Sequence, residues 1–258
     1  MPKKLIITEK PSVAMEFAKV LKINTKRQNG YMESENWIIT WCVGHLVTMS
    51  YPEKYDEKLK FWRLDTLPFM PKEYKYEVIP NVQKQFNTIQ MLLNREDVST
   101  IYVATDSGRE GEYIYRLVEQ MIGVKGKDRK RVWIDSQTEE EIKKGIREAK
   151  ELTEYDSLAD SAYLRAKEDY LIGINFSRLL TIIYGKRAAS KLQEDRISIS
   201  VGRVMTCVLG MVVSREREIR NFVKVPYYKI VGEFGPKDSS FTAEWKVTEN
   251  SSQKESVK

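Results

Sequence analysis

The sequence predicts an α/β domain with a mostly parallel sheet, followed by an all-helical domain and the start of a further β-containing domain. Up to about residue 152, short apolar runs of strand length alternate with segments whose apolar residues recur at helical spacing. Between residues 153 and 220 the helical spacing continues without a strand-like run. From Val225 the alternating residues of VPYYKIVGEF again indicate a strand. We therefore expect domains at 1–152, 153–220 and 221–258, the last of them incomplete and ending in a polar tail.

Strands and helices alternate along the first domain. Strands are expected where apolar residues run together, at 5–8, 37–42, 101–105 and 131–134. Helices are expected where apolar residues recur every three or four positions, at 11–21, 82–93, 110–122 and 139–150. Residues 51–76, rich in Pro, Tyr and Trp, should be ordered but irregular. Because helices separate the strands, we expect a Rossmann-like sheet with helices on both faces.

Most of the net positive charge lies within residues 160–220 of the second domain. Two long helices are expected there, at 155–184 and 201–220. The chain has a net charge of +6 and an isoelectric point near 9.0, and the excess of Lys and Arg lies largely between residues 160 and 220. This distribution favours the helical part as a surface for a phosphate backbone. A solvated helix face would give the same charge distribution.

Composition excludes several other classes of protein. No apolar run approaches the roughly 20 residues that span a bilayer. The N-terminus lacks the apolar stretch and the cleavage site of a signal peptide. Cys42 and Cys207 lie far apart and form no metal-spaced pair, and two lone cysteines suit a reducing compartment. We therefore expect a cytoplasmic protein.

Acidic residues follow two of the expected strands. Glu9 comes after the first strand, Asp106 after the strand at 101–105, and Glu110 in the first turn of the next helix. If the two strands are neighbours, these carboxylates meet at the carboxyl edge of the sheet, where α/β proteins bind ligands. Three carboxylates there would be costly unless a cation such as Mg²⁺ neutralised them or one stayed protonated. Lys10 and Arg109 stand beside them and could hold a phosphate.

A simpler explanation exists for the acids on the helix. Glu110 and Glu112 would both favour the positive end of a helix dipole. We prefer that explanation for Glu112. It is weaker for Asp106, which lies in a glycine-containing turn between strand and helix.

Five short motifs resemble those of one enzyme family. They are, in order, EKPS at 9–12, GHL at 44–46, DSGREGE at 106–112, DYLIGINFSR at 169–178 and SVGRVMT at 200–206. Their types and order resemble the Toprim domain and the following helical domain of type IA DNA topoisomerases, and most of all those of bacterial topoisomerase III. The resemblance implies the Toprim fold for the first domain. It also implies a bacterial protein, associated with the nucleoid or encoded on a mobile element.

The resemblance implies a mechanism. In such enzymes a tyrosine attacks a phosphodiester of single-stranded DNA, another strand passes through the gap, and the break is resealed. Glu9 would then be the general acid and base at the 3′ oxygen, and Lys10 would stabilise charge on the phosphate. Arg109 would clamp a phosphate. Mg²⁺ would be held at Glu9, Asp106 and Glu110.

The resemblance also implies contacts with single-stranded DNA. His45, the only histidine, would lie near the phosphate at the active site, although a lone histidine is usually structural. The helical motifs would supply the remaining contacts, at Arg165, Asp169, Asn175, Ser177, Arg178, Ser200, Arg203 and Thr206. Arg165 and Asp169 lie one helical turn apart and could instead form an ion pair within the helix. A helicase is a candidate partner of the whole protein.

Two departures from the family pattern stand out. Gly108 occupies a position where the family usually has a second acidic residue, so Mg²⁺ binding should be weak. None of the 14 tyrosines lies in the Tyr-x-Arg-Thr-Asp-Ser setting of the nucleophile. We therefore expect an N-terminal portion of a topoisomerase that binds single-stranded DNA without cutting it. The alternatives are a truncated DNA-binding protein without catalysis and, less favoured, a stand-alone Toprim nuclease.

Overall fold

The computed structural model describes residues 2–23 and 26–246. The chain divides into two units, Met1–Thr206 and Cys207–Lys258. The first unit holds the sheet, its helices and most of the helical segment, and every site considered below lies within it. The boundaries predicted at residues 152 and 220 stay a prediction.

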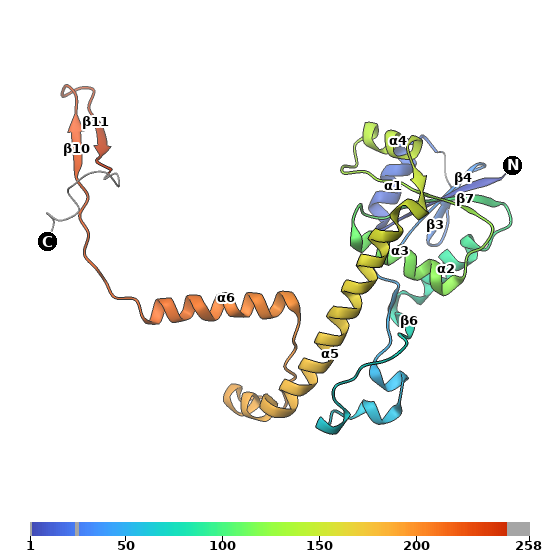
Figure 1. Cartoon of the computed structure of the whole chain (residues 1–258). Coiled ribbons are helices and arrows are strands. Elements are labelled where there is room, and N and C mark those ends of the chain that lie inside the picture. Colours follow the sequence, from blue (N-terminus) through green and yellow to red (C-terminus); the bar gives the residue numbers. More distant parts are fainter. Residues whose placement is uncertain (1, 24–25, 247–258) are drawn as a thin grey trace. The chain divides into compact units, whose positions relative to one another are not determined.

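A seven-stranded sheet forms the centre of the first unit (Figure 1). Its strands lie in the order β2 (Lys26–Arg27), β3 (Tyr31–Glu33), β4 (Trp37–Trp41), β1 (Lys3–Thr8), β7 (Val98–Ala104), β8 (Asp128–Arg131) and β9 (Lys150–Glu151). The four strands β4, β1, β7 and β8 are parallel, and the short strands at both edges are antiparallel. The expected α/β fold with a mostly parallel core is confirmed.

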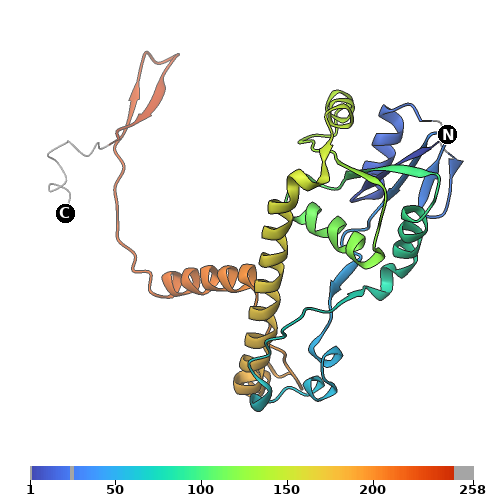
Figure 2. The same ribbon diagram turned by 45° about the vertical axis from the view of Figure 1, so that its right-hand side comes forward.

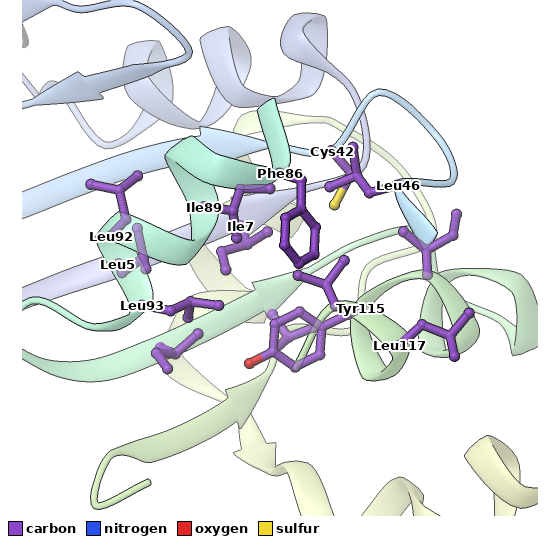
Figure 3. Packing of buried hydrophobic residues seen from close by; sticks show 14 of the residues in the cluster. Leu5, Ile7, Cys42, Leu46, Phe86, Ile89, Leu92, Leu93, Tyr115 and Leu117 are labelled. Atoms are coloured by element: carbon purple, nitrogen blue, oxygen red, sulfur yellow. The ribbon is translucent and has the colours of Figure 1, made fainter. Parts of the chain in front are cut away.

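Apolar side chains on the two faces of the sheet form two cores. Leu5 and Ile7 of β1 point into the first core, which also contains residues of α2 (Gln83–Leu93) and α3 (Arg109–Ile122) (Figure 3). Ile6 points the other way, into a core with α1 (Pro11–Val20) and α4 (Glu139–Arg147). Because successive strand residues face opposite sides, an all-apolar strand needs this double cover.

The prediction from the sequence misplaced one strand and missed several short ones. The strand expected at 131–134 is β8, which spans Asp128–Arg131 and reads DRKR. These charged residues form no apolar run, so nothing in the sequence marked them as a strand. The small two-stranded sheet of β5 (Val47–Met49) and β6 (Tyr76–Val78) was not predicted either. It closes the base of the irregular segment 51–76.

The irregular segment 51–76 is ordered, as predicted. It contains three short 3-10 turns, η1 (Pro52–Lys54), η2 (Glu57–Lys60) and η3 (Leu64–Thr66). It lies beside α5 in both ribbon views (Figures 1 and 2). Hydrogen bonds from that helix to its backbone hold it there.

The helical segment begins with a 37-residue helix, α5 (Asp156–Leu192), longer than the predicted 155–184. A loop at 193–202 returns along it before α6 (Arg203–Arg220) begins. The strand expected at 225–234 is confined to β10 (Val231–Phe234), which pairs with β11 (Phe241–Glu244). The predicted polar tail lies outside the described residues. No helix in the described part of the chain has the length and apolarity to cross a membrane.

Candidate functional site

Two carboxylates from distant parts of the sequence meet at the carboxyl edge of the sheet. β1 and β7 are parallel neighbours with Thr8 opposite Ala104, so the residues that follow them lie side by side. The backbone N–H of Asp106 donates to Oε2 of Glu9 at 3.4 Å. Nζ of Lys10 lies 3.5 Å from Oδ2 of Asp106 and 3.7 Å from Oε1 of Glu9. The structure thus brings together Glu9, Lys10 and Asp106, as the strand pattern predicted.

Glu9 and Asp106 have different surroundings. The side chain of Glu9 is 11% exposed and that of Asp106 is 54% exposed. Burial, and next the negative charge of Asp106, raise the pKa of Glu9 above its ordinary value, while the Asp106 amide and Lys10 oppose the rise. A carboxyl group with a raised pKa can carry a proton nearer neutral pH, as a general acid requires.

Glu110 does not join this pair. Its Oε1 lies 2.6 Å from Nε2 of His45, which follows β4 and packs edge-on against Tyr113. Among the described residues, no three His, Cys, Asp or Glu side chains are arranged to hold a metal ion. Glu9 and Asp106 thus meet directly while Glu110 contacts His45, and the holding of Mg²⁺ by all three carboxylates stays a prediction. Mutual repulsion of carboxylates favours this separation.

A buried arginine supports the turn that carries Asp106. Arg131, at the end of β8, is fully buried and forms an ion pair with the fully buried Glu112. Arg116 contacts the same carboxylate, with its Nε 3.2 Å from Oε2. The helix-dipole explanation of Glu112 was therefore incomplete, because its carboxylate is buried and pairs with two arginines. Arg131 was not among the predicted site residues, because its only signal in the sequence is an arginine directly before an apolar run.

The glycine in the Arg-Glu-Gly-Glu stretch has a steric reason. A Cβ on Gly111 would lie 2.0 Å from the carbonyl oxygen of Asp106. In the same place the hydroxyl of Thr105 donates to the carbonyl of Gly111 at 2.8 Å. The turn after β7 and the first turn of α3 are therefore packed backbone against backbone, which leaves Asp106 little room to move.

A groove of about 690 Å³ lies next to this edge of the sheet. Its polar lining consists of His45, Thr48, Arg109, Glu110, Tyr113, Arg165, Asp169, Tyr170 and Arg203. Arg203 binds Asp169 with two hydrogen bonds, from Nε at 3.0 Å and Nη2 at 2.7 Å. Asp169 is thus paired with Arg203 of α6 and not with Arg165 on its own helix. Several predicted site residues, from both sequence halves, line this one groove.

The remaining residues of the α5 motif contact other parts of the chain. Asn175 accepts from the N–H of Phe69 at 2.6 Å and donates to its carbonyl at 2.9 Å. Arg178 is buried, donates to the carbonyl of Leu59 at 2.8 Å and stacks over the ring of Trp62. These contacts hold segment 51–76 against α5. Contact of these two residues with DNA stays a prediction.

Three predicted residues lie around the loop that leads into α6. The hydroxyl of Ser177 accepts from the N–H of Val201 at 2.8 Å and holds this loop to α5. Ser200 and Thr206 are exposed on either side of Arg203 and do not line the groove. DNA contact by these three residues also stays a prediction.

Comparison with known proteins places this geometry in a family. The model of the Toprim domain matches residues 4–136, and the model described as DNA topoisomerase matches residues 153–258. The chain belongs to the Toprim family. The Toprim match contains β1, β7, β8 and all residues of the carboxylate edge. The second match begins just before α5.

Several relatives that share one name match most of this chain in sequence. It is 41% identical to DNA topoisomerase 3 of Bacillus subtilis, 42% identical to that of Shouchella clausii and 43% identical to that of Bacillus cereus. Each match covers 230 residues, which is 89% of this chain and 30% of the relative. The chain therefore spans less than a third of those proteins. The resemblance to type IA topoisomerases that five motifs indicated is confirmed.

Proposed function

We propose that this chain supplies the Toprim and DNA-gripping parts of a type IA topoisomerase of the topoisomerase 3 kind. Such an enzyme cuts single-stranded DNA through a 5′-phosphotyrosine, passes a strand and reseals the break. One observation carries the proposal: Asp106 meets Glu9 and Lys10 at the sheet edge, and Arg109 and Glu110, a few residues further on, line the arginine-rich groove. A DNA strand in that groove would run past the acidic pair.

The residues at the edge suit the roles that the family resemblance implies. Glu9, with its raised pKa, would give a proton to the leaving 3′ oxygen and take it back on resealing. Lys10 would stabilise the charge that builds on the phosphate. Arg109, at the start of α3, would clamp a phosphate oxygen, and the positive end of that helix would favour the same anion.

Mg²⁺ is the metal that the Toprim family implies. Glu9 and Asp106 fit it, because Mg²⁺ is commonly held by one or two carboxylates, with water and phosphate completing its shell. Glu110 would be a third ligand only after leaving His45. When bound, the ion would position the DNA ends for resealing. His45, released from Glu110, could then donate a hydrogen bond to a phosphate.

The groove combines features that suit single-stranded DNA. Arg109, Arg165 and Arg203 would contact phosphates, and Tyr170 offers an aromatic ring in the same wall. Arg203 would exchange the Asp169 carboxylate for a phosphate. Ser200 and Thr206 flank it where the first turn of α6 presents backbone N–H groups. We assign Asn175, Ser177 and Arg178 an indirect part, which is to hold the neighbouring segments in place.

The cellular setting follows from the same proposal. The relatives named DNA topoisomerase 3 come from bacteria. A DNA substrate would place the protein in the bacterial cytoplasm at the nucleoid. A helicase is a candidate partner of the whole protein, since it would supply single strands.

Fluorescence anisotropy tests the groove. The chain should bind a single-stranded oligonucleotide roughly tenfold more tightly than a duplex of the same sequence, and the affinity should fall as salt rises. Equal affinity for both forms would contradict the proposal. Cleavage of DNA by this chain in Mg²⁺ would instead favour the nuclease alternative, since none of its tyrosines has the expected nucleophile setting.

Titration calorimetry tests the metal pair. We expect weak Mg²⁺ binding that is lost in Asp106→Ala and kept in Asp128→Ala. Asp128 is an exposed aspartate at the start of β8, away from the carboxyl edge, and serves as the matched control. If both variants lost Mg²⁺ binding equally, or neither lost it, Asp106 would not be a metal ligand.

A further inference from the structure

A single guanidinium group donates to several carbonyls around the turn that carries Asp106. Nη1 of Arg131 donates to the carbonyl oxygens of Val103 at 3.1 Å, Thr105 at 2.7 Å and Val132 at 2.9 Å. Its Nη2 donates to the carbonyl oxygen of Asp106 at 2.8 Å. Carbonyls beyond the end of a strand have lost their sheet partners, and buried ones need another donor. Arg131 supplies that donor for Thr105 and Asp106, which follow β7, whereas the carbonyl of Val103 within β7 also accepts from the N–H of Val132 at 2.9 Å.

The charge of Arg131 is neutralised on the side away from the turn. Its Nε donates to Glu112, and both side chains are fully buried. The second oxygen of Glu112 accepts from Arg116, which also donates to the carbonyl of Leu152 at 2.7 Å and lies 2.8 Å from Asp156. Glu112 is therefore fixed from two sides. Each nitrogen of the Arg131 guanidinium has a hydrogen-bond partner in this arrangement.

This arrangement does more than fill the interior. A buried ion pair is by itself weak evidence for stability, because desolvation offsets much of the attraction. Here four of the five hydrogen bonds go to backbone carbonyls at the edge of the site, and one goes to Asp106 itself. The amide of Asp106 in turn donates to Glu9. A change in the guanidinium would therefore move Asp106 relative to Glu9.

We propose that Arg131, held by Glu112, is a positioning residue that fixes Asp106 beside Glu9. Arg131 does not touch the reacting groups, and it acts through the backbone of the turn. A lysine could keep the charge and the pairing with Glu112. It could not reach all four carbonyls, because one ammonium lacks the planar fork of a guanidinium. The consequence for Mg²⁺ rests on the proposed function, whereas the consequence for the turn does not.

Amide hydrogen exchange measured by NMR tests the position of the turn directly. In Arg131→Lys the Asp106 amide should exchange at least roughly tenfold faster, while amides of β4 and α1 keep their rates. Arg129→Lys is the matched control, because Arg129 lies on the same strand and pairs with Glu119, away from the turn. It should leave the Asp106 amide unchanged. Unchanged exchange at Asp106 in Arg131→Lys, or equal acceleration throughout the sheet, would overturn the proposal.

Calorimetry adds the functional readout. Arg131→Lys should weaken Mg²⁺ binding about tenfold at a temperature where circular dichroism shows it folded, and Arg129→Lys should not. Full affinity in the folded Arg131→Lys variant would overturn the proposal. If the unsubstituted chain binds no Mg²⁺, the metal assignment fails, and the exchange experiment still decides whether Arg131 positions the turn.

A second variant covers the case in which Arg131→Lys does not fold. Glu112→Gln keeps the size of the side chain and an acceptor for Arg131 but removes the compensating charge. The Asp106 amide should again exchange faster than amides of β4 and α1, by about threefold. Exchange at the original rate in folded Glu112→Gln would exclude the pair as the device that holds the turn.

Discussion

The carboxyl edge of the sheet and the helix α5 show two ways in which predicted site residues are placed. At the edge, Glu9 and Asp106 come from strands that are parallel neighbours, and they meet as predicted. On α5, residues of one motif separate, since Asp169 faces the groove while Asn175 and Arg178 hold segment 51–76. Strand order alone sets which residues meet at an edge. Helical spacing shows which residues share a face, but not what that face contacts.

The two regions also differ in how firmly their side chains are held. Glu9 is 11% exposed, and the turn of Asp106 rests on the buried Arg131. In the groove, Asp169 and Arg203 are 42% and 48% exposed and bind each other. An exposed ion pair contributes little stability and separates easily. We therefore expect the edge to be set before substrate binds, and the groove to rearrange when a phosphate enters.

The largest effect should separate the two faces of α5. Arg178→Ala removes a buried side chain that contacts Leu59 and Trp62, and should lower the free energy of unfolding by about 2–3 kcal/mol. Arg165→Ala, on the groove side of the helix, should cost less than about 0.5 kcal/mol. Urea unfolding measures both.

Oligonucleotide anisotropy should give the opposite order. Arg165→Ala should weaken binding to single-stranded DNA, and Arg178→Ala should change it by less than about twofold. Suppose instead that Arg178→Ala kept its stability and bound single-stranded DNA tenfold more weakly. Arg178 would then contact DNA directly. The distinction between the two faces would then be wrong.

The next effect concerns the exposed pair in the groove. Arg203→Ala should weaken binding of single-stranded DNA about tenfold. The slope of log affinity against log salt concentration should also fall by about one, because one phosphate contact fewer releases about one counterion fewer. Arg196→Ala is the matched control, because it removes the same charge from an exposed loop position that does not line the groove. Similar losses in both variants would mean that Arg203 contributes only to the general positive charge.

A smaller effect concerns Glu9. Its pKa is raised in the folded protein, above the ordinary value of 4.5, so the folded state favours the protonated form. This contribution to stability is complete below the unfolded pKa and is lost as pH rises through the folded pKa. Glu9→Gln should therefore raise the melting temperature by a few degrees at pH 8 without Mg²⁺. The gain should disappear below pH 4.5. A gain that did not depend on pH would show that ionisation of Glu9 is not the cause.

The smallest expected effect is a gain at Gly108. Its backbone is extended, and a Cβ there would meet no atom within 4 Å. Gly108→Asp should thus be accommodated and should strengthen Mg²⁺ binding by roughly threefold by adding a carboxylate beside Asp106. Gly108→Asn has the same shape without the charge and should not. Equal affinities of the two variants would show that position 108 does not face the ion.

Some features of the site could be predicted because they depend on local pattern and strand order. The apolar runs before Glu9 and Asp106 indicated adjacent strand ends, and the motifs indicated the family. The contact of Glu110 with His45 could not be predicted, because His45 follows another strand and no local pattern names it as the partner of a residue on α3. β8 was misplaced because DRKR contains no apolar signal, and the role of Arg131 was hidden with it.

The sequence by itself determined the α/β alternation, the meeting of Glu9 with Asp106 on condition that their strands are neighbours, and membership of the Toprim family. These follow from the periodicity of apolar residues, from the rule that parallel strands end at one edge, and from short motifs. Only the tertiary structure decided the burial of Glu112 and Arg131, the pairing of Asp169 with Arg203, and the use of Arg178 to hold segment 51–76. A charged side chain takes its role from the partner that folding brings within hydrogen-bond distance, and local spacing does not name that partner.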